Sequence, residues 1–169
     1  MRAIRFLLSG LLLLVASWFF VSAANAPSDS TTIILLRHAE KDTVGDDPVL
    51  TVKGAHRAAG LSSVFPDITP DEFYSTNFVR TRETVAPWTK QTNKEINFYE
   101  PVKLPELADK LKKEIGKTIV VVGHSNTVPP LVNLILGADK YKNLADTEYS
   151  KIFILTIKKG TVKDKVIHY

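Results

Sequence analysis

The sequence predicts an α/β protein in which helices cover both faces of a mainly parallel sheet, a three-layer α/β/α sandwich. Two runs of branched apolar residues, 33–36 and 118–122, lack polar alternation and are typical of strands buried on both faces. Helical segments alternate with the strands, as in βαβ units. The last two segments, 151–158 and 161–168, alternate around a Lys-Gly turn and predict a C-terminal hairpin.

The remaining elements alternate in type along the chain. We expect, in order, a helix over 52–64, a strand over 72–75, a helix over 79–89, a strand over 96–99, a helix over 104–115 and a helix over 127–136. Thr51 is the expected cap of the first of these helices. Pro87 leaves the end of the helix from 79 open, since proline breaks a helix interior.

The first 26 residues have the three parts of a secretory signal: early arginines, an apolar run over 6–21 and a final stretch of small residues with a cleavage site. Cleavage after Ala24 or after Ala26 satisfies the small-residue preference, and Pro27 favours Ala24. The alternative is an uncleaved anchor, although the run is slightly short of the ~20 residues a spanning helix needs. We therefore expect a periplasmic or secreted protein that meets the membrane only through this segment, if it is uncleaved.

The rest of the chain, 27–169, is expected to form one domain with a proper core. The net charge of +4 includes Arg2 and Arg5 of the signal segment, so the remainder is nearly balanced and predicts no nucleic-acid partner. Cysteine is absent, which excludes a disulfide framework, a thiolate nucleophile and a cysteine metal site.

The candidate catalytic residues lie at the carboxyl ends of two predicted strands. In an open parallel sheet, ligands bind beyond the carboxyl ends of the strands. The first apolar run is followed by Arg37 and His38, and the second by Gly123 and His124. If the two strands are neighbours, both imidazoles face one crevice with Arg37 beside them. The helix from 79 adds Arg80 or Arg82, and spacing alone does not choose between them.

Two imidazoles and two guanidinium groups suit phosphoryl transfer. That reaction needs an in-line nucleophile and positive donors around the phosphoryl oxygens. An imidazole that attacks phosphorus forms a phosphohistidine, which water then hydrolyses, so that one hard step becomes two. Gly123, before His124, is expected to let the backbone approach the phosphate closely.

At these positions the sequence resembles the histidine phosphatase superfamily, whose fold is called phosphoglycerate-mutase-like. The resemblance is carried by Leu36-Arg37-His38-Ala39-Glu40, by Ser75 with Arg80-Thr81-Arg82-Glu83-Thr84, by Gly123-His124-Ser125 and by Leu50-Thr51-Val52-Lys53-Gly54. It implies a short, single-domain, exported member whose domain is 27–169.

The resemblance implies that His38 is the phosphorylated nucleophile and that Arg37, Arg80 and His124 complete the phosphate pocket. It selects Arg80 over Arg82 and implies that neither a metal ion nor another cofactor takes part. One departure is Val44, which stands where an asparagine often lines the pocket of the family.

The general acid is left open by the sequence. Glu100 is the first candidate because it follows the strand over 96–99 on the crevice side. Glu106, at the start of the next helix, is the second, and shorter relatives work without a dedicated acid.

These features predict an exported phosphomonoester hydrolase that acts through phosphorylated His38 on a phosphorylated small molecule or a phosphoprotein. A mutase is disfavoured because the chain lacks room for the large inserted segment that closes over the substrate in mutases. The alternative is a non-catalytic module of the same fold that binds phosphorylated ligands.

Overall fold

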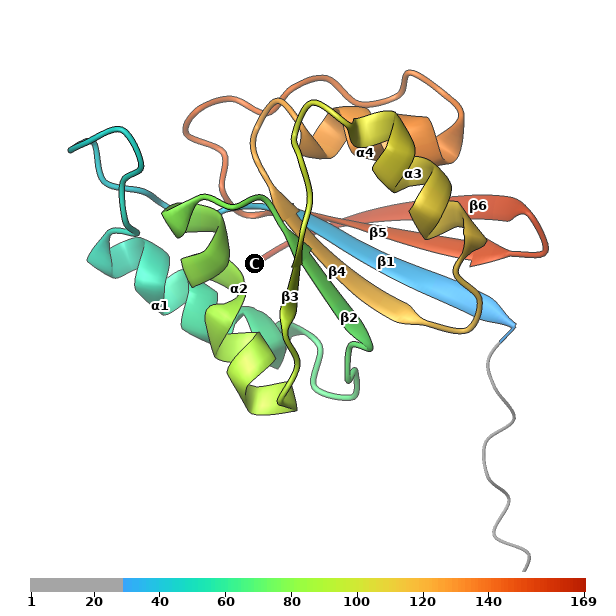
Figure 1. Cartoon of the computed structure of the whole chain (residues 1–169), viewed down its shortest axis with the longest axis horizontal. Coiled ribbons are helices and arrows are strands. Elements are labelled where there is room, and N and C mark those ends of the chain that lie inside the picture. Colours follow the sequence, from blue (N-terminus) through green and yellow to red (C-terminus); the bar gives the residue numbers. More distant parts are fainter. Residues whose placement is uncertain (1–28) are drawn as a thin grey trace, which may run out of the picture.

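The computed structural model describes residues 29–169, which form one six-stranded sheet with the order β3-β2-β4-β1-β5-β6 (Figure 1). The strands are β1 (Ser30–Arg37), β2 (Glu72–Ser75), β3 (Ile96–Phe98), β4 (Thr118–Gly123), β5 (Lys151–Lys158) and β6 (Thr161–His168). The helices are α1 (Val52–Gly60), α2 (Val79–Thr92), α3 (Leu104–Lys113) and α4 (Val128–Leu136), and a short 3-10 helix, η1 (Leu61–Val64), follows α1. The predicted signal segment lies outside the described residues.

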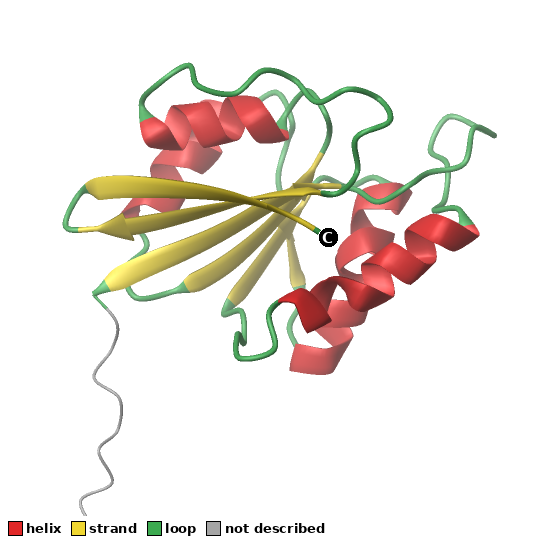
Figure 2. Cartoon of the chain, turned by 180° about the vertical axis from the view of Figure 1, so that it is seen from behind, coloured by secondary structure: helices red, strands yellow, loops and turns green. Residues whose placement is uncertain are grey.

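The sheet is mainly parallel, as predicted. Strands β3, β2, β4 and β1 run parallel to one another, and β5 and β6 form the expected antiparallel hairpin at one edge. Helices α1 and α2 cover one face, and α3 and α4 cover the other (Figures 1 and 2). The predicted three-layer α/β/α arrangement is confirmed.

The packing on both faces of β1 explains why its sequence does not alternate between apolar and polar residues. Ile33 and Leu35 pack into the core that α3 and α4 cover, whereas Ile34 and Leu36 pack into the core beneath α2 and η1. All four side chains are fully buried. A strand buried on both faces has no solvent side on which a polar residue would be favoured.

All four helices differ from their predicted bounds, α3 by ending at Lys113 and α4 by beginning at Val128. The first ends at Gly60 and continues as η1, and Thr51 caps it by accepting a hydrogen bond from the Gly54 N–H at 3.1 Å. Helix α2 passes through Pro87 and ends only at Thr92, where Asn93 adopts a left-handed conformation. Burial of Trp88 against aromatic neighbours offsets the backbone hydrogen bond that proline removes.

The pairing of β1 with β4 sets up the functional edge of the sheet. Arg37 lies opposite Gly123 in the register, so the residues that follow each strand emerge side by side. Among residues 29–169, no helix has the length and apolar character needed to cross a bilayer.

Candidate active site

The two predicted histidines meet at the carboxyl ends of β1 and β4. The His38 N–H donates to the Gly123 carbonyl oxygen at 2.9 Å, which continues the β1–β4 ladder past the end of both strands. The imidazole centroids of His38 and His124 are 5.5 Å apart, with an interplanar angle of 65°. The expectation that the two strands are neighbours is therefore confirmed.

The His38 ring is held in one tautomer. Its Nδ1 lies 2.8 Å from the Ala39 carbonyl oxygen, and a carbonyl only accepts hydrogen bonds. Nδ1 therefore carries the proton of the neutral ring, and the lone pair is on Nε2. The backbone turn around this ring is fixed by the Thr84 hydroxyl, which accepts a hydrogen bond from the Ala39 N–H at 2.9 Å.

The His124 ring is oriented by a chain of hydroxyl groups. Its Nε2 lies 2.9 Å from Thr76 Oγ1, which lies 3.0 Å from Thr81 Oγ1. The Thr81 hydroxyl donates to backbone carbonyls at 2.8 Å, so Thr76 donates to Thr81 and accepts from His124. This leaves Nδ1 of His124 as the nitrogen available to a ligand.

Arg37 is fixed by the loop that precedes β5. Its Nη1 donates to the carbonyl oxygens of Ala145, Asp146 and Glu148 at 2.9, 3.0 and 3.2 Å. The Tyr149 ring lies under the guanidinium, 4.2 Å from its centre. The Nε of Arg37 is buried and has no hydrogen-bond partner among the described residues.

Arg80 reaches the same edge from the first turn of α2. Its guanidinium lies over the Phe78 ring at 4.5 Å, and its Nη1 contacts Asp47 Oδ1 at 3.3 Å. Its Nε is also buried and has no hydrogen-bond partner. Arg82, two residues later, donates instead to Asn77 in an exposed contact. The helix phase thus turns Arg80, and not Arg82, toward the histidines.

The electrostatics of the site keep both rings neutral. Burial, followed by the nearby Arg37, lowers the pKa of His38 to about 3, although the bond to Ala39 opposes the shift. Burial and then Arg80 and Arg37 lower the pKa of His124 to about 4. Two neutral imidazoles beside two guanidinium groups give a positive pocket that suits a phosphate group.

These side chains line one cavity of about 440 Å³. The lining residues are Arg37, His38, Lys41, Phe78, Arg80, Pro101, His124, Ser125, Asn126, Thr127 and Asp146. Glu100 is exposed and does not line the cavity, although its neighbour Pro101 does. Glu106 is exposed in the first turn of α3, where it faces Lys103 at 4.0 Å. The structure therefore brings together the two histidines and two arginines but neither glutamate.

Sequence reasoning missed Asp47, Thr76 and Tyr149. Thr76 had a usable signal, because it directly follows β2 at the same edge of the sheet. Asp47 and Tyr149 lie in loops far along the chain from the arginines that they contact, and no local pattern connects them.

The packing around Gly123 adds a reason for glycine at this position. A Cβ on this residue would lie 2.6 Å from the Tyr99 hydroxyl and 2.8 Å from Thr127 Oγ1. Glycine is therefore required by these neighbouring side chains. The Thr127 hydroxyl accepts a hydrogen bond from the His124 N–H at 2.9 Å, so this close packing also fixes the start of the turn that carries His124.

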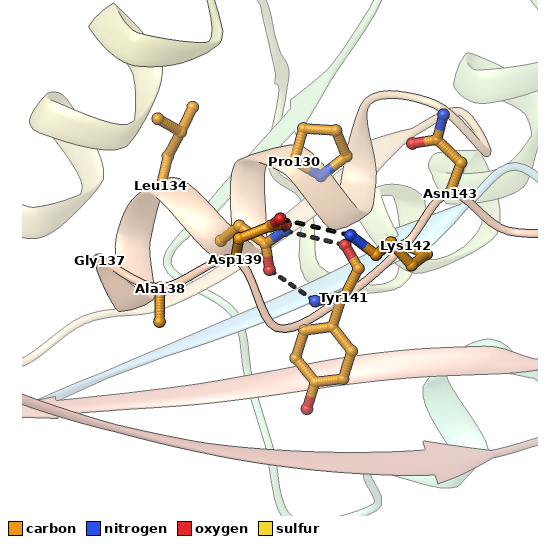
Figure 3. Close-up of a pocket in the computed structure, with 9 residues that line it drawn as sticks. Pro130, Leu134, Gly137, Ala138, Asp139, Tyr141, Lys142 and Asn143 are labelled. Atoms are coloured by element: carbon orange, nitrogen blue, oxygen red, sulfur yellow. Dashed lines mark hydrogen bonds and ion pairs between the residues drawn. The ribbon is translucent and has the colours of Figure 1, made fainter.

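A larger hollow of about 710 Å³ lies elsewhere, along the end of α4 and the loop that follows (Figure 3). There Lys142 pairs with Asp139 (Figure 3). The Asn133 side chain donates to Asp139 and to the Tyr141 carbonyl, and it accepts from the N–H groups of Lys140 and Tyr141. Its polar side chains are engaged with one another rather than directed at a ligand. Nowhere in residues 29–169 do three or more His, Cys, Asp or Glu side chains cluster in a way that could hold a metal ion.

Solved structures share this fold over most of their length. A protein named as the phosphohistidine phosphatase SixA, from Nakamurella multipartitia, is 18% identical with a TM-score of 0.60, covering 85% of this chain and 98% of its own. A phosphoserine phosphatase from Entamoeba histolytica, in complex with phosphoserine, is 17% identical with a TM-score of 0.64, covering 80% and 95%. A phosphoglycerate mutase from Bacillus anthracis is 15% identical with a TM-score of 0.61, covering 83% and 94%.

Residues 33–103 match the family model of the histidine phosphatase superfamily, branch 1. This part of the chain is therefore similar to that superfamily. The match includes Arg37, His38 and Arg80, whereas His124 lies beyond its end, and the structure brings that residue to the other three. The predicted phosphoglycerate-mutase-like fold is confirmed. No curated protein sequence matches the chain.

Proposed function

We propose that the protein is an exported phosphatase that hydrolyses phosphate monoesters through a phosphohistidine formed on His38. The observation that carries the proposal is that two imidazoles and two guanidinium groups line one cavity. Arg37, His38, Arg80 and His124 all line it, and His38 Nε2 has its lone pair free. Positive donors around a nucleophile suit a phosphoryl group, whose oxygens accept hydrogen bonds.

In the first step, His38 Nε2 attacks phosphorus, the N–P bond forms and the bond to the alcohol oxygen breaks. The ring needs no prior deprotonation, because its pKa is lowered to about 3 and Nε2 is already bare. The Ala39 carbonyl accepts the Nδ1–H and stabilises the positive charge that develops on the imidazole. Arg37 and Arg80 bind the phosphoryl oxygens, where charge accumulates in the transition state.

In the second step, water attacks phosphorus, and neutral His38 and inorganic phosphate are released. His124 contributes through Nδ1, since its Nε2 is engaged by Thr76. Burial, and then Arg80 and Arg37, lower the pKa of this ring, but a bound phosphate dianion acts in the opposite direction. A protonated His124 then donates to a phosphoryl oxygen while substrate is bound.

The leaving alcohol needs a proton, and Glu100 and Glu106 stand outside the residues that line the cavity. This placement supports substrates with good leaving groups, which depart without an acid, and a water molecule serves the others. The substrate is either a phosphorylated small molecule or a phosphoprotein. Structural relatives include a phosphatase bound to phosphoserine and a protein named as a phosphohistidine phosphatase.

Trapping the intermediate tests the proposal. The protein is mixed briefly with a radiolabelled phosphodonor and denatured, and the label is challenged with acid and with base. We expect acid-labile, base-stable label in the wild type and in His56→Ala, which changes an exposed histidine of α1. We expect none in His38→Ala.

Two results would contradict the proposal. Label that persists in His38→Ala would mean that another residue is the nucleophile. Phosphate binding without label or turnover would favour the non-catalytic module that binds phosphorylated ligands. Export is tested separately, by determining the amino terminus of the protein recovered outside the cytoplasm, which we expect to follow Ala24 or Ala26.

A further inference from the structure

We propose that Lys41 forms a subsite for a second anionic group, so that the preferred substrates are phosphate esters whose alcohol part carries a negative charge. A carboxylate or a further phosphate on the alcohol meets this requirement equally. The inference deepens the proposed phosphatase function and rests on it.

Lys41 lies at the rim of the phosphate pocket. It follows His38 by three residues and lines the same cavity. Its backbone is fixed, because Lys41 forms an antiparallel bridge with Leu50, and the Asp42 N–H donates to the Val49 carbonyl at 2.9 Å. The backbone of Lys41 is therefore fixed beside the pocket, and the residue does not belong to the exposed part of the loop.

The Lys41 ammonium has no carboxylate partner in the part of the chain that the structure describes. Its hydrogen bond is to the Asp42 carbonyl oxygen at 3.2 Å. Other lysines of the fold, such as Lys117 and Lys140, contact carboxylates at 2.5 and 2.6 Å. An ammonium group without such a partner can bind an anion without first breaking an ion pair.

Lys41 is the third cationic side chain that lines the cavity, besides Arg37 and Arg80. A phosphate ester carries about −1.5 to −2 at neutral pH, so a substrate with a second anionic group brings more negative charge than the two arginines can match. Asp146 is the one carboxylate among the lining residues, and the structure contains no ion pair between it and Lys41. Asp47 is engaged by Arg80.

Depth separates the two binding regions. Arg37, His38 and His124 are 4%, 2% and 9% exposed, whereas Lys41 is only half-buried. A phosphoryl group bound against the buried set directs its alcohol portion outward, toward the rim. Ser125 and Asn126 lie on this rim too. Rim side chains that can donate hydrogen bonds suit the oxygens of an anion.

A matched pair of substrates tests the subsite: para-carboxyphenyl phosphate and para-carbamoylphenyl phosphate, which are close in shape and differ in charge. In Lys41→Gln we expect kcat/KM for the carboxylate substrate to fall about 3- to 10-fold, mainly through KM, because a partly exposed charge pair is worth up to this much. Turnover of the carbamoyl substrate should stay within about twofold. Lys41→Arg should keep the preference, and high salt should weaken it in the wild type.

Lys90→Gln is the control, because it removes the same charge from the last turn of α2, away from Arg80 at the other end of that helix. An equal loss on both substrates in Lys41→Gln would assign Lys41 to the transferred phosphate, and no loss on either would leave it without a binding role. Either result overturns the subsite, while His38 labelling in the variant shows that the phosphatase function stands. A wild type that turns over neither substrate overturns both proposals.

Discussion

Replacing Arg80 by alanine should reduce catalysis without unfolding the protein. Its Nη1 is already shared with Asp47, so Nη2 is the terminal nitrogen left for the substrate. A hydrogen bond to a charged group is worth about 1.5–3 kcal/mol, and loss of one oxyanion donor costs about 10²- to 10³-fold in kcat. At about 1.4 kcal/mol per factor of ten, one or two such bonds agree with that range.

The variant also removes the cation that pairs with Asp47, which then keeps only its hydrogen bond from the Val79 N–H among the described residues. Repulsion between Asp47 and the bound phosphate adds to the loss, so the double variant Arg80→Ala/Asp47→Asn should recover part of the activity. Arg80→Lys should be intermediate, because it keeps the charge but loses the planar fork of donors.

The assay is kcat/KM on an aryl phosphate, together with urea unfolding of each variant. Arg82→Ala is the matched control, since Arg82 is two residues away in the same helix and contacts only Asn77 among the described residues. The reasoning would be refuted if Arg80→Ala kept wild-type kcat/KM, or if Arg82→Ala lost as much.

Two further predictions concern stability. Because burial lowers the pKa of His38 to about 3 and of His124 to about 4, from 6.5, the unfolded chain binds more protons below pH 6.5. The free energy of unfolding should therefore fall as pH falls from 7.5 to 5, by on the order of 2 kcal/mol for each ring. A fall that persists undiminished in His38→Gln/His124→Gln, measured by urea unfolding, would contradict this. Gly54→Ala should destabilise by about 3 kcal/mol or more, because its Cβ would lie 2.1 Å from the Glu40 carbonyl oxygen. Gly60→Ala, with open space around its Cβ, should stabilise by about 0.5–1 kcal/mol, and equal unfolding midpoints for the two variants would count against this packing argument.

The sequence by itself determined the layers of the fold and the residues that end the central strands. Runs such as 33–36 and 118–122 have no polar side, and that local property alone requires burial on both faces. A strand that ends in Arg37 and His38 also places them at the ligand edge of a parallel sheet, wherever that strand lies in the order. The hairpin at 151–168 could also be predicted from local sequence, because alternation and a Lys-Gly turn are properties of adjacent residues.

Only the tertiary structure decided which of these groups meet. The neighbouring positions of β1 and β4 join residues more than eighty positions apart, and the phase of α2 determines that Arg80 faces the histidines. The loop carbonyls that hold Arg37 follow it by more than a hundred residues. Glu100 is a residue for which local position was misleading. It follows a strand at the correct edge of the sheet, but it is not among the residues that line the cavity. Contacts between distant segments depend on how the whole chain packs, and a local pattern carries no information about them.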